Sequence, residues 1–269
     1  MIRVNGQAMD CVSALDRGLA YGDGVFRTLR TEAGHPLWWA DHYAKLAADC
    51  AALMLECPGE AALLAEVLQV AGPGPGQGVV KIMLTRGAGA RGYAVPAESA
   101  PTCIVIASAL PQHARNAGAI QARWCQLRLA RQPRLAGIKH LNRLEHVLAR
   151  AEWNDPAILE GLLCDDSGAV VSGVMSNVLW VKDDELFTPD LGQCGVAGVA
   201  RKRVLRAAAR LGVRSRIGRF LPDELLAADE VMICNSLLGV RHLARLEKKI
   251  WSPAGWTSTL NAALYEDVD

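Results

Sequence analysis

Apolar runs of strand length recur along this chain, and helical patterns separate them only at irregular intervals. The strand-like runs lie at residues 25–31, 79–85, 102–109, 120–127 and 230–234, with a hairpin-like region at 161–181. The helical patterns lie at 40–56, 60–70, 141–153 and 199–211. Because strands and helices do not alternate regularly, we expect an α/β (α+β) fold with mixed or antiparallel sheets rather than a doubly wound one.

A turn-rich segment at residues 110–118 lies between two of these strand-like runs. Such segments often separate compact units, so it predicts two domains. Residues 1–113 would form a small N-terminal α/β domain, and residues 114–269 a larger C-terminal domain that carries Lys139. With 51% hydrophobic residues, the chain can bury a sizeable core.

Positive and negative charges are balanced in this sequence, with 29 Lys and Arg against 28 Asp and Glu. This balance favours neither a nucleic acid nor an anionic membrane as a partner. The first residues lack a secretory signal pattern, and charges interrupt every apolar run before it reaches membrane-spanning length. We therefore expect a cytoplasmic protein that acts on a small molecule.

The eight cysteines are scattered singly, with no Cys-x-x-Cys pair and no histidine at metal-ligand spacing. Several lie inside apolar runs, where a thiol packs as a small hydrophobic side chain. The sequence therefore predicts no metal site and no catalytic cysteine.

Lys139 stands in the string Ala136-Gly-Ile-Lys-His-Leu-Asn-Arg-Leu-Glu145, in apolar surroundings just before a predicted helix. A lysine in such surroundings can have a lowered pKa and can then act as a nucleophile or a base. Taken alone, the string is more typical of an ordinary charge that flanks a helix.

Five segments in order extend this signal along nearly the whole chain. They are Asp16–Phe26, Thr85–Tyr93, Gly137–Glu145, Gly195–Arg201 and Ala228–Ser236. Together they resemble the fold-type IV pyridoxal-phosphate enzymes, and the Lys139 string resembles the aminodeoxychorismate lyase family in particular. The resemblance implies a two-domain fold, an active site at the domain interface and a homodimer.

The resemblance also implies site residues. Lys139 would bind pyridoxal 5'-phosphate and move protons, while the backbone N–H groups of Val199 and Ala200 would hold its phosphate, as helix starts commonly do. Asn235 and Ser236 would add donors to the same anion. The alternatives are an ordinary helix turn at Val199 and an ordinary strand end at Asn235.

Arg91 and Tyr93 are the substrate-binding pair that the resemblance implies, because a guanidinium suits a dicarboxylate substrate. Arg86 is a further candidate, although it is as readily interpreted as a residue that holds its own loop together. Thr28 is a candidate proton relay, with a plain strand threonine as the alternative.

Two positions depart from the family pattern as we align it. Gly173 stands where we expect the glutamate that keeps the cofactor pyridine protonated, and Lys45 stands where an arginine usually grips the phosphate. Both changes predict weaker use of the cofactor. Two hypotheses therefore remain open: the enzyme uses pyridoxal phosphate, or it works without it.

The function that the resemblance implies is elimination of pyruvate from 4-amino-4-deoxychorismate, which gives p-aminobenzoate for folate biosynthesis. One alternative is a D-amino-acid or branched-chain aminotransferase of the same fold. Another is an inactive relative that serves as a binding or scaffold protein.

Overall fold

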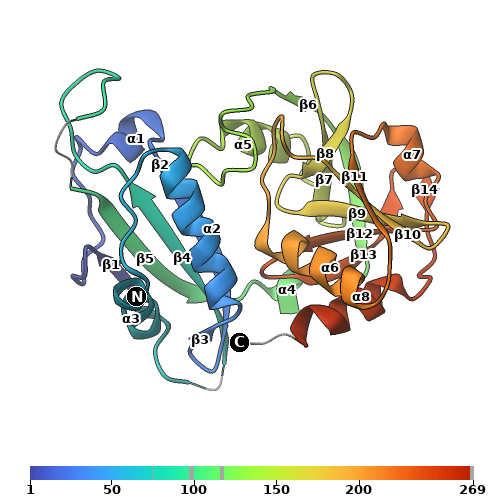
Figure 1. The fold of residues 1–269 in the computed structure, drawn as a ribbon, viewed down its shortest axis with the longest axis horizontal. Coiled ribbons are helices and arrows are strands. Elements are labelled where there is room, and N and C mark those ends of the chain that lie inside the picture. Colours follow the sequence, from blue (N-terminus) through green and yellow to red (C-terminus); the bar gives the residue numbers. More distant parts are fainter. Residues whose placement is uncertain (75, 97–99, 116–117, 267–269) are drawn as a thin grey trace. The chain divides into compact units, whose positions relative to one another are not determined.

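The computed structural model describes residues 1–74, 76–96, 100–115 and 118–266, and these form two compact units (Figure 1). Among the described residues, unit 1 contains Met1–His113 and also Ile138–Asn142, whereas unit 2 contains Ala114–Gly137 and residues 143–266. The chain thus returns to unit 1 for five residues. Lys139 therefore lies in unit 1 and not, as the sequence predicted, in the C-terminal unit.

Unit 1 is built on a five-stranded sheet with the order β1-β5-β4-β2-β3, in which every neighbouring pair is antiparallel. The strands are β1 (Ile2–Val4), β2 (Gly24–Glu32), β3 (His35–Pro36), β4 (Gln77–Thr85) and β5 (Thr102–Ala109). β2 and β4 are in register over their whole length, from Gly24 opposite Thr85 to Glu32 opposite Gln77. This long pairing makes β2 a rigid base for the residues at its start.

Three helices complete unit 1: α1 (Arg17–Tyr21), α2 (Trp39–Ala52) and α3 (Glu60–Ala71). The buried positions of α2 recur at intervals of three and four residues, as expected for a helix with one face against a sheet. Leu46 and Cys50 of α2 pack with Val25 and Leu29 of β2 in the unit 1 core. Figure 1 shows α2 running across the sheet.

The Lys139 segment is extended rather than helical. The helix that the sequence predicted from residue 141 begins three residues later, as α5 (Leu144–Arg150). The reason is that this segment pairs with the start of β2 through an isolated antiparallel bridge between His140 and Val25. Pairing with a sheet edge satisfies the backbone groups of the segment as well as a helix would.

Unit 2 contains a nine-stranded mixed sheet with the order β11-β10-β9-β12-β13-β6-β7-β8, and β14 pairs with β13. Its strands are β6 (Ile120–Leu129), β7 (Glu160–Asp165), β8 (Val170–Gly173), β9 (Asn177–Lys182), β10 (Glu185–Pro189), β11 (Ser215–Gly218), β12 (Glu230–Asn235), β13 (Gly239–Leu246) and β14 (Lys249–Ile250). Three pairs, β10 with β11, β13 with β6 and β6 with β7, are parallel. The predicted mixed and antiparallel sheets are therefore confirmed.

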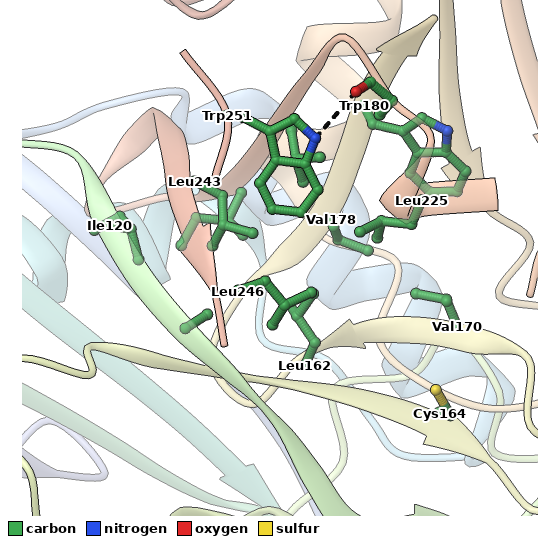
Figure 2. Close-up of a cluster of buried hydrophobic side chains, with 14 residues drawn as sticks. Ile120, Leu162, Cys164, Val170, Val178, Trp180, Leu225, Leu243, Leu246 and Trp251 are labelled. Carbon is green, nitrogen blue, oxygen red and sulfur yellow. Dashed lines mark hydrogen bonds between the residues drawn. The ribbon is translucent and has the colours of Figure 1, made fainter. Parts of the chain in front are cut away.

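Trp180 and Trp251 anchor the core of unit 2 (Figure 2). Trp180 is 1% exposed and stacks on Phe187 of the neighbouring strand. Trp251 is 5% exposed, and its indole N–H donates to the carbonyl of Ala228 at 3.0 Å, the dashed line in Figure 2. A buried indole normally finds such a partner.

Helices α6 (Val199–Arg210), α7 (Pro222–Leu226) and α8 (Trp256–Tyr265) also belong to unit 2, and α4 (Gln112–Arg115) spans the division between the units. The predicted turn-rich segment lies partly outside the described residues, which omit 116–117. Within the described ranges, every helix is too short or too polar to cross a membrane.

Candidate active site

The backbone around Lys139 is fixed on two sides. On one side the Lys139 carbonyl accepts from the Phe26 N–H at 2.9 Å, and the Leu141 N–H donates to the Gly24 carbonyl at 2.9 Å. On the other side the Lys139 N–H donates to Oδ2 of Asp49 at 3.0 Å. The backbone from which the Lys139 side chain extends is therefore held by both β2 and α2.

The amine of Lys139 lies over an aromatic ring, with its Nζ 4.3 Å from the ring centroid of Phe26. Thr28 lies two residues along β2 and so points to the same face of the sheet as Phe26. Lys81 is directly opposite Thr28 on β4, and its Nζ is 5.2 Å from the same Phe26 ring. The structure thus gathers two amines and a hydroxyl on one face.

Lys81 was missed by the sequence analysis. Its signal was a charged residue in the middle of the apolar run Val79–Thr85. A charged residue is common on a strand with one solvated face, so the sequence did not single out Lys81. Its place beside the Lys139 site follows only from its pairing with Thr28.

Lys45 is engaged in an ion pair. Its Nζ bonds to Oδ1 of Asp49, one turn along α2, while Arg27 of β2 bonds to Oδ2 of the same carboxylate. Burial lowers the pKa of Lys45 and of Arg27, although the attraction of Asp49 opposes this in both cases. The lysine predicted to hold a phosphate is therefore already paired with a carboxylate of its own helix.

Arg86 is 5% exposed and is surrounded by acceptors. It donates to both carboxylate oxygens of Asp23, at 2.8 and 3.0 Å, and to the carbonyls of Leu53 and Met54, both at 2.8 Å. Burial alone would raise the pKa of Asp23, but hydrogen bonds from Arg86 and Arg17 lower it. This geometry supports a structural role for Arg86, although the arginine ties the end of β4 to Asp23 and to the residues after α2 rather than to its own loop.

Arg91 and Tyr93 lie in an outward loop next to α1. Arg17 holds the loop by donating to the carbonyl of Gly92 at 2.9 Å, and the Tyr21 ring lies 5.4 Å from that of Tyr93. Arg91 is exposed and Tyr93 is 86% exposed. The loop therefore has an ordered backbone and presents both side chains outward.

In unit 2, the start of α6 offers backbone donors. The N–H of Lys202 bonds to the carbonyl of Gly198, so the N–H groups of Val199, Ala200 and Arg201 have no acceptor within the helix. The N-cap residue is Gly198, which has no side chain to cap these N–H groups. Asn177 binds the N–H of Gly198 at 3.2 Å and the carbonyl of Val196 at 2.9 Å, which fixes the turn that leads into the helix.

The Asn235 side chain stabilises its own turn. It donates to the carbonyl of Met175 at 3.1 Å and accepts from the N–H groups of Leu237 and Leu238 at 2.9 and 2.8 Å. Ser236 is half-buried at the end of the same strand. The predicted role of Asn235 as a side-chain donor to an anion would thus compete with these bonds, whereas Ser236 remains a candidate.

Gly173 lies against a buried carboxylate. A Cβ at this position would be 2.3 Å from Ser176 Oγ and 2.8 Å from Glu160 Oε2. Glu160 is fully buried and accepts from Ser176 Oγ at 2.7 Å and from the Val174 N–H at 3.0 Å. A larger side chain at this position would clash with Ser176 and Glu160, so packing favours glycine here.

On a strand, successive side chains alternate between faces. Ser172 precedes Gly173 on β8, so its side chain lies on the face opposite to a Cβ at Gly173. Ser172 is 4% exposed and lies opposite Leu163 of β7. A variant that adds a carboxylate to this strand should therefore be made at Ser172 as well as at Gly173. Burial raises the pKa of Glu160, although Ser176 and three backbone N–H groups donate to it.

An amine on a sheet face in one unit and an uncapped helix start in a mixed-sheet unit are the parts expected of a fold-type IV enzyme. The chain belongs to the class IV aminotransferase family, whose sequence model matches residues 24–246.

Two lyases are among its relatives. Aminodeoxychorismate lyase from Vibrio harveyi is 35% identical over 95% of this chain and 96% of its own length. The crystal structure of 4-amino-4-deoxychorismate lyase from Pseudomonas aeruginosa covers all of both chains with 43% identity and a TM-score of 0.92. The chain is also similar to an aminotransferase: D-alanine aminotransferase from Bacillus licheniformis is 25% identical over 98% of this chain and 95% of its own length.

Proposed function

We propose that this chain is a 4-amino-4-deoxychorismate lyase that releases pyruvate and p-aminobenzoate for folate biosynthesis in the cytoplasm. The observation that carries the proposal is the Lys139 amine, which lies 4.3 Å above the Phe26 ring on a strand held from both sides. The two lyase relatives support this reaction over the others in the family.

The chemistry needs a base and an acid. The amine of Lys139 takes the ring proton from the carbon that bears the substrate amino group, and the released electron pair enters the ring as the bond to the ether oxygen breaks. Enolpyruvate leaves, gains a proton at carbon and becomes pyruvate, while the ring becomes aromatic. Thr28 is the proposed proton relay, because it shares its sheet face with Phe26.

The substrate carries two carboxylates, so the site needs cations other than the base. Lys81 provides one on the same sheet face, 5.2 Å from the Phe26 ring. Arg91 and Tyr93 are the proposed second contact, since both are exposed on a loop that Arg17 orders. Arg86 has no part in this proposal, because Asp23 and two carbonyls already bind it.

The residues present fit pyridoxal phosphate in two respects: Lys139 supplies a primary amine, and the start of α6 supplies N–H donors suited to a phosphate. Val199, Ala200 and Ser236 are the proposed phosphate contacts. When bound, the cofactor would draw electrons from the carbon that loses its proton.

A reaction without the cofactor is the second hypothesis, and the Lys45–Asp49 ion pair favours it, because a paired lysine holds a phosphate less well. Treatment with hydroxylamine followed by dialysis separates the two. A protein that keeps its turnover afterwards works without the cofactor, whereas a protein that regains turnover only with added pyridoxal phosphate depends on it.

The direct test of the reaction is to incubate the purified chain with 4-amino-4-deoxychorismate and to follow p-aminobenzoate fluorescence. A parallel assay offers D-alanine or leucine with 2-oxoglutarate. Formation of p-aminobenzoate without amino transfer supports the lyase. Robust amino transfer without p-aminobenzoate would establish an aminotransferase instead.

We also propose a homodimer. The exposed Arg91 and Tyr93 support this, because an ordered loop that presents an aromatic ring and a guanidinium outward is typical of a contact surface. Light scattering on the purified chain should give twice the chain mass of 28.8 kDa. A measured mass equal to that of one chain would exclude the dimer.

A further inference from the structure

Asp49 joins three elements of unit 1 through one buried carboxylate. It is 2% exposed, and it accepts from Arg27 of β2, from Lys45 of its own helix α2 and from the backbone N–H of Lys139. A buried carboxylate is stable only with such partners. The bond from Asp49 to the Lys139 backbone is a third contact, separate from the two ion pairs.

The cluster carries an excess of positive charge. Arg27 is 3% exposed, and its Nη2 also donates to the carbonyl of Lys45 at 3.1 Å. Its Nε is buried without a hydrogen-bond partner in the described part of the chain. Two cations therefore share one carboxylate directly beside the strand that carries Lys139.

We propose that Asp49 is a positioning residue for Lys139, which fixes the backbone of the reacting amine and offsets the positive charge of Arg27 and Lys45. The inference rests on the proposed function only in taking Lys139 as the reacting amine. Asp49 accepts a hydrogen bond from the backbone N–H of Lys139, so it acts on the chemistry by positioning Lys139.

The negative charge of Asp49 should shift the pKa of Lys139 in a direction that can be tested. The charged and titratable groups that face or flank the Lys139 segment include Asp49 and Lys45 of α2, Arg27 of β2, Lys81 of β4 and the adjacent His140. Removing the negative charge leaves cations that disfavour a protonated amine, so the pKa of Lys139 should fall. Removing a positive charge should raise it.

The experiment measures the rate at which the Lys139 amine of the full chain reacts with trace acetic anhydride between mildly acidic and strongly basic pH. The chain is first treated with hydroxylamine so that no carbonyl compound blocks the amine, and the label at Lys139 is quantified by peptide mass spectrometry. Asp49→Asn keeps an acceptor for the Lys139 N–H but removes the charge. The midpoint is the pH at which the Lys139 amine reacts at half its maximal rate. Because about the length of a lysine side chain separates Asp49 from this amine, we expect the midpoint of Asp49→Asn to fall by about one pH unit.

Lys45→Met should move the midpoint upward, and the Asp49→Asn/Lys45→Met double variant should return it towards wild type because the two charges cancel. Glu60→Gln is the matched control: it removes one negative charge from an exposed position of α3 in the same unit. Its midpoint should stay at the wild-type value. Opposite shifts in the two single variants are a signature that general loosening of the fold does not produce.

A midpoint that stays at the wild-type value in Asp49→Asn, or that shifts in the same direction in both single variants, would overturn the proposal. Should Asp49→Asn fail to fold, Lys45→Met decides the question alone, and an unchanged midpoint counts against it. The labelling needs no substrate, so its result stands even if no p-aminobenzoate is formed. Failure of the lyase assay and failure of this inference are therefore separate outcomes.

Discussion

Replacing Gly173 with alanine should destabilise unit 2, because the added methyl group has no room. The new Cβ would lie 2.3 Å from Ser176 Oγ and 2.8 Å from the Glu160 carboxyl group. Ser176 cannot turn away without giving up its 2.7 Å hydrogen bond to Glu160. Either the backbone of β8 shifts or a buried carboxylate loses a donor.

Overpacking of this kind costs about 1–3 kcal/mol of unfolding free energy. For a chain of this size the melting temperature changes by roughly 2–4 °C per kcal/mol, so a drop of about 2–12 °C is expected. Gly173→Glu should be worse, because it adds a second carboxylate beside Glu160 in the same buried space. Thermal and urea unfolding of the purified variants provide the measurement.

Gly74→Ala is the matched control, since no neighbour among the described residues lies within 4 Å of a Cβ at that glycine. Its unfolding free energy should stay within about 0.5 kcal/mol of wild type. Adding Ser176→Ala to Gly173→Ala should relieve the clash, so the two substitutions should cost less together than their sum. A Gly173→Ala variant that unfolds like the wild type would refute the packing explanation.

Three further predictions concern other buried contacts. Glu160→Ala should lower the unfolding free energy by about 3 kcal/mol or more in urea titrations, because Ser176 and backbone N–H groups lose their acceptor; a change under 1 kcal/mol, at roughly the level of one ordinary hydrogen bond, would contradict this. Trp251→Phe should cost about 1–3 kcal/mol in the same assay, because the Ala228 carbonyl loses its donor, whereas an unchanged midpoint would show that this bond is dispensable. Asp23 has a lowered pKa, so its stabilising effect is complete above its ordinary value of 3.8 and is lost as the pH falls through the folded value. Asp23→Asn should therefore flatten the loss of stability in acid, and an identical acid profile would argue against the pairing with Arg86.

The sequence predicted the long elements well, because their patterns are local. The strand run at 25–31 and the helical pattern at 60–70 correspond to β2 and α3 within one or two residues at each end. Apolar periodicity is sufficient in such segments, since each buries one face against a neighbour. The small elements β1, α1 and β14 were not predicted, because two to five residues carry too little pattern.

The arrangement of the site was harder to predict, because it depends on contacts between distant residues. Lys139 was expected before a helix, but its N–H is bound by Asp49, which lies 90 residues earlier in the chain. The pairing of Lys45 with Asp49 is local and could have been predicted from their spacing of four residues on one helix. The contact between Gly173 and Glu160 could not, since it depends on the pairing of β7 with β8.

The most direct test of the central claim is the rate of p-aminobenzoate formation by wild type and Lys139→Ala, with exposed Lys248→Ala as the matched control. If the amine at position 139 moves the proton, its removal should slow turnover by about a hundredfold or more, while Lys248→Ala should keep the wild-type rate. A Lys139→Ala protein that folds and forms product as fast as the wild type would contradict the account.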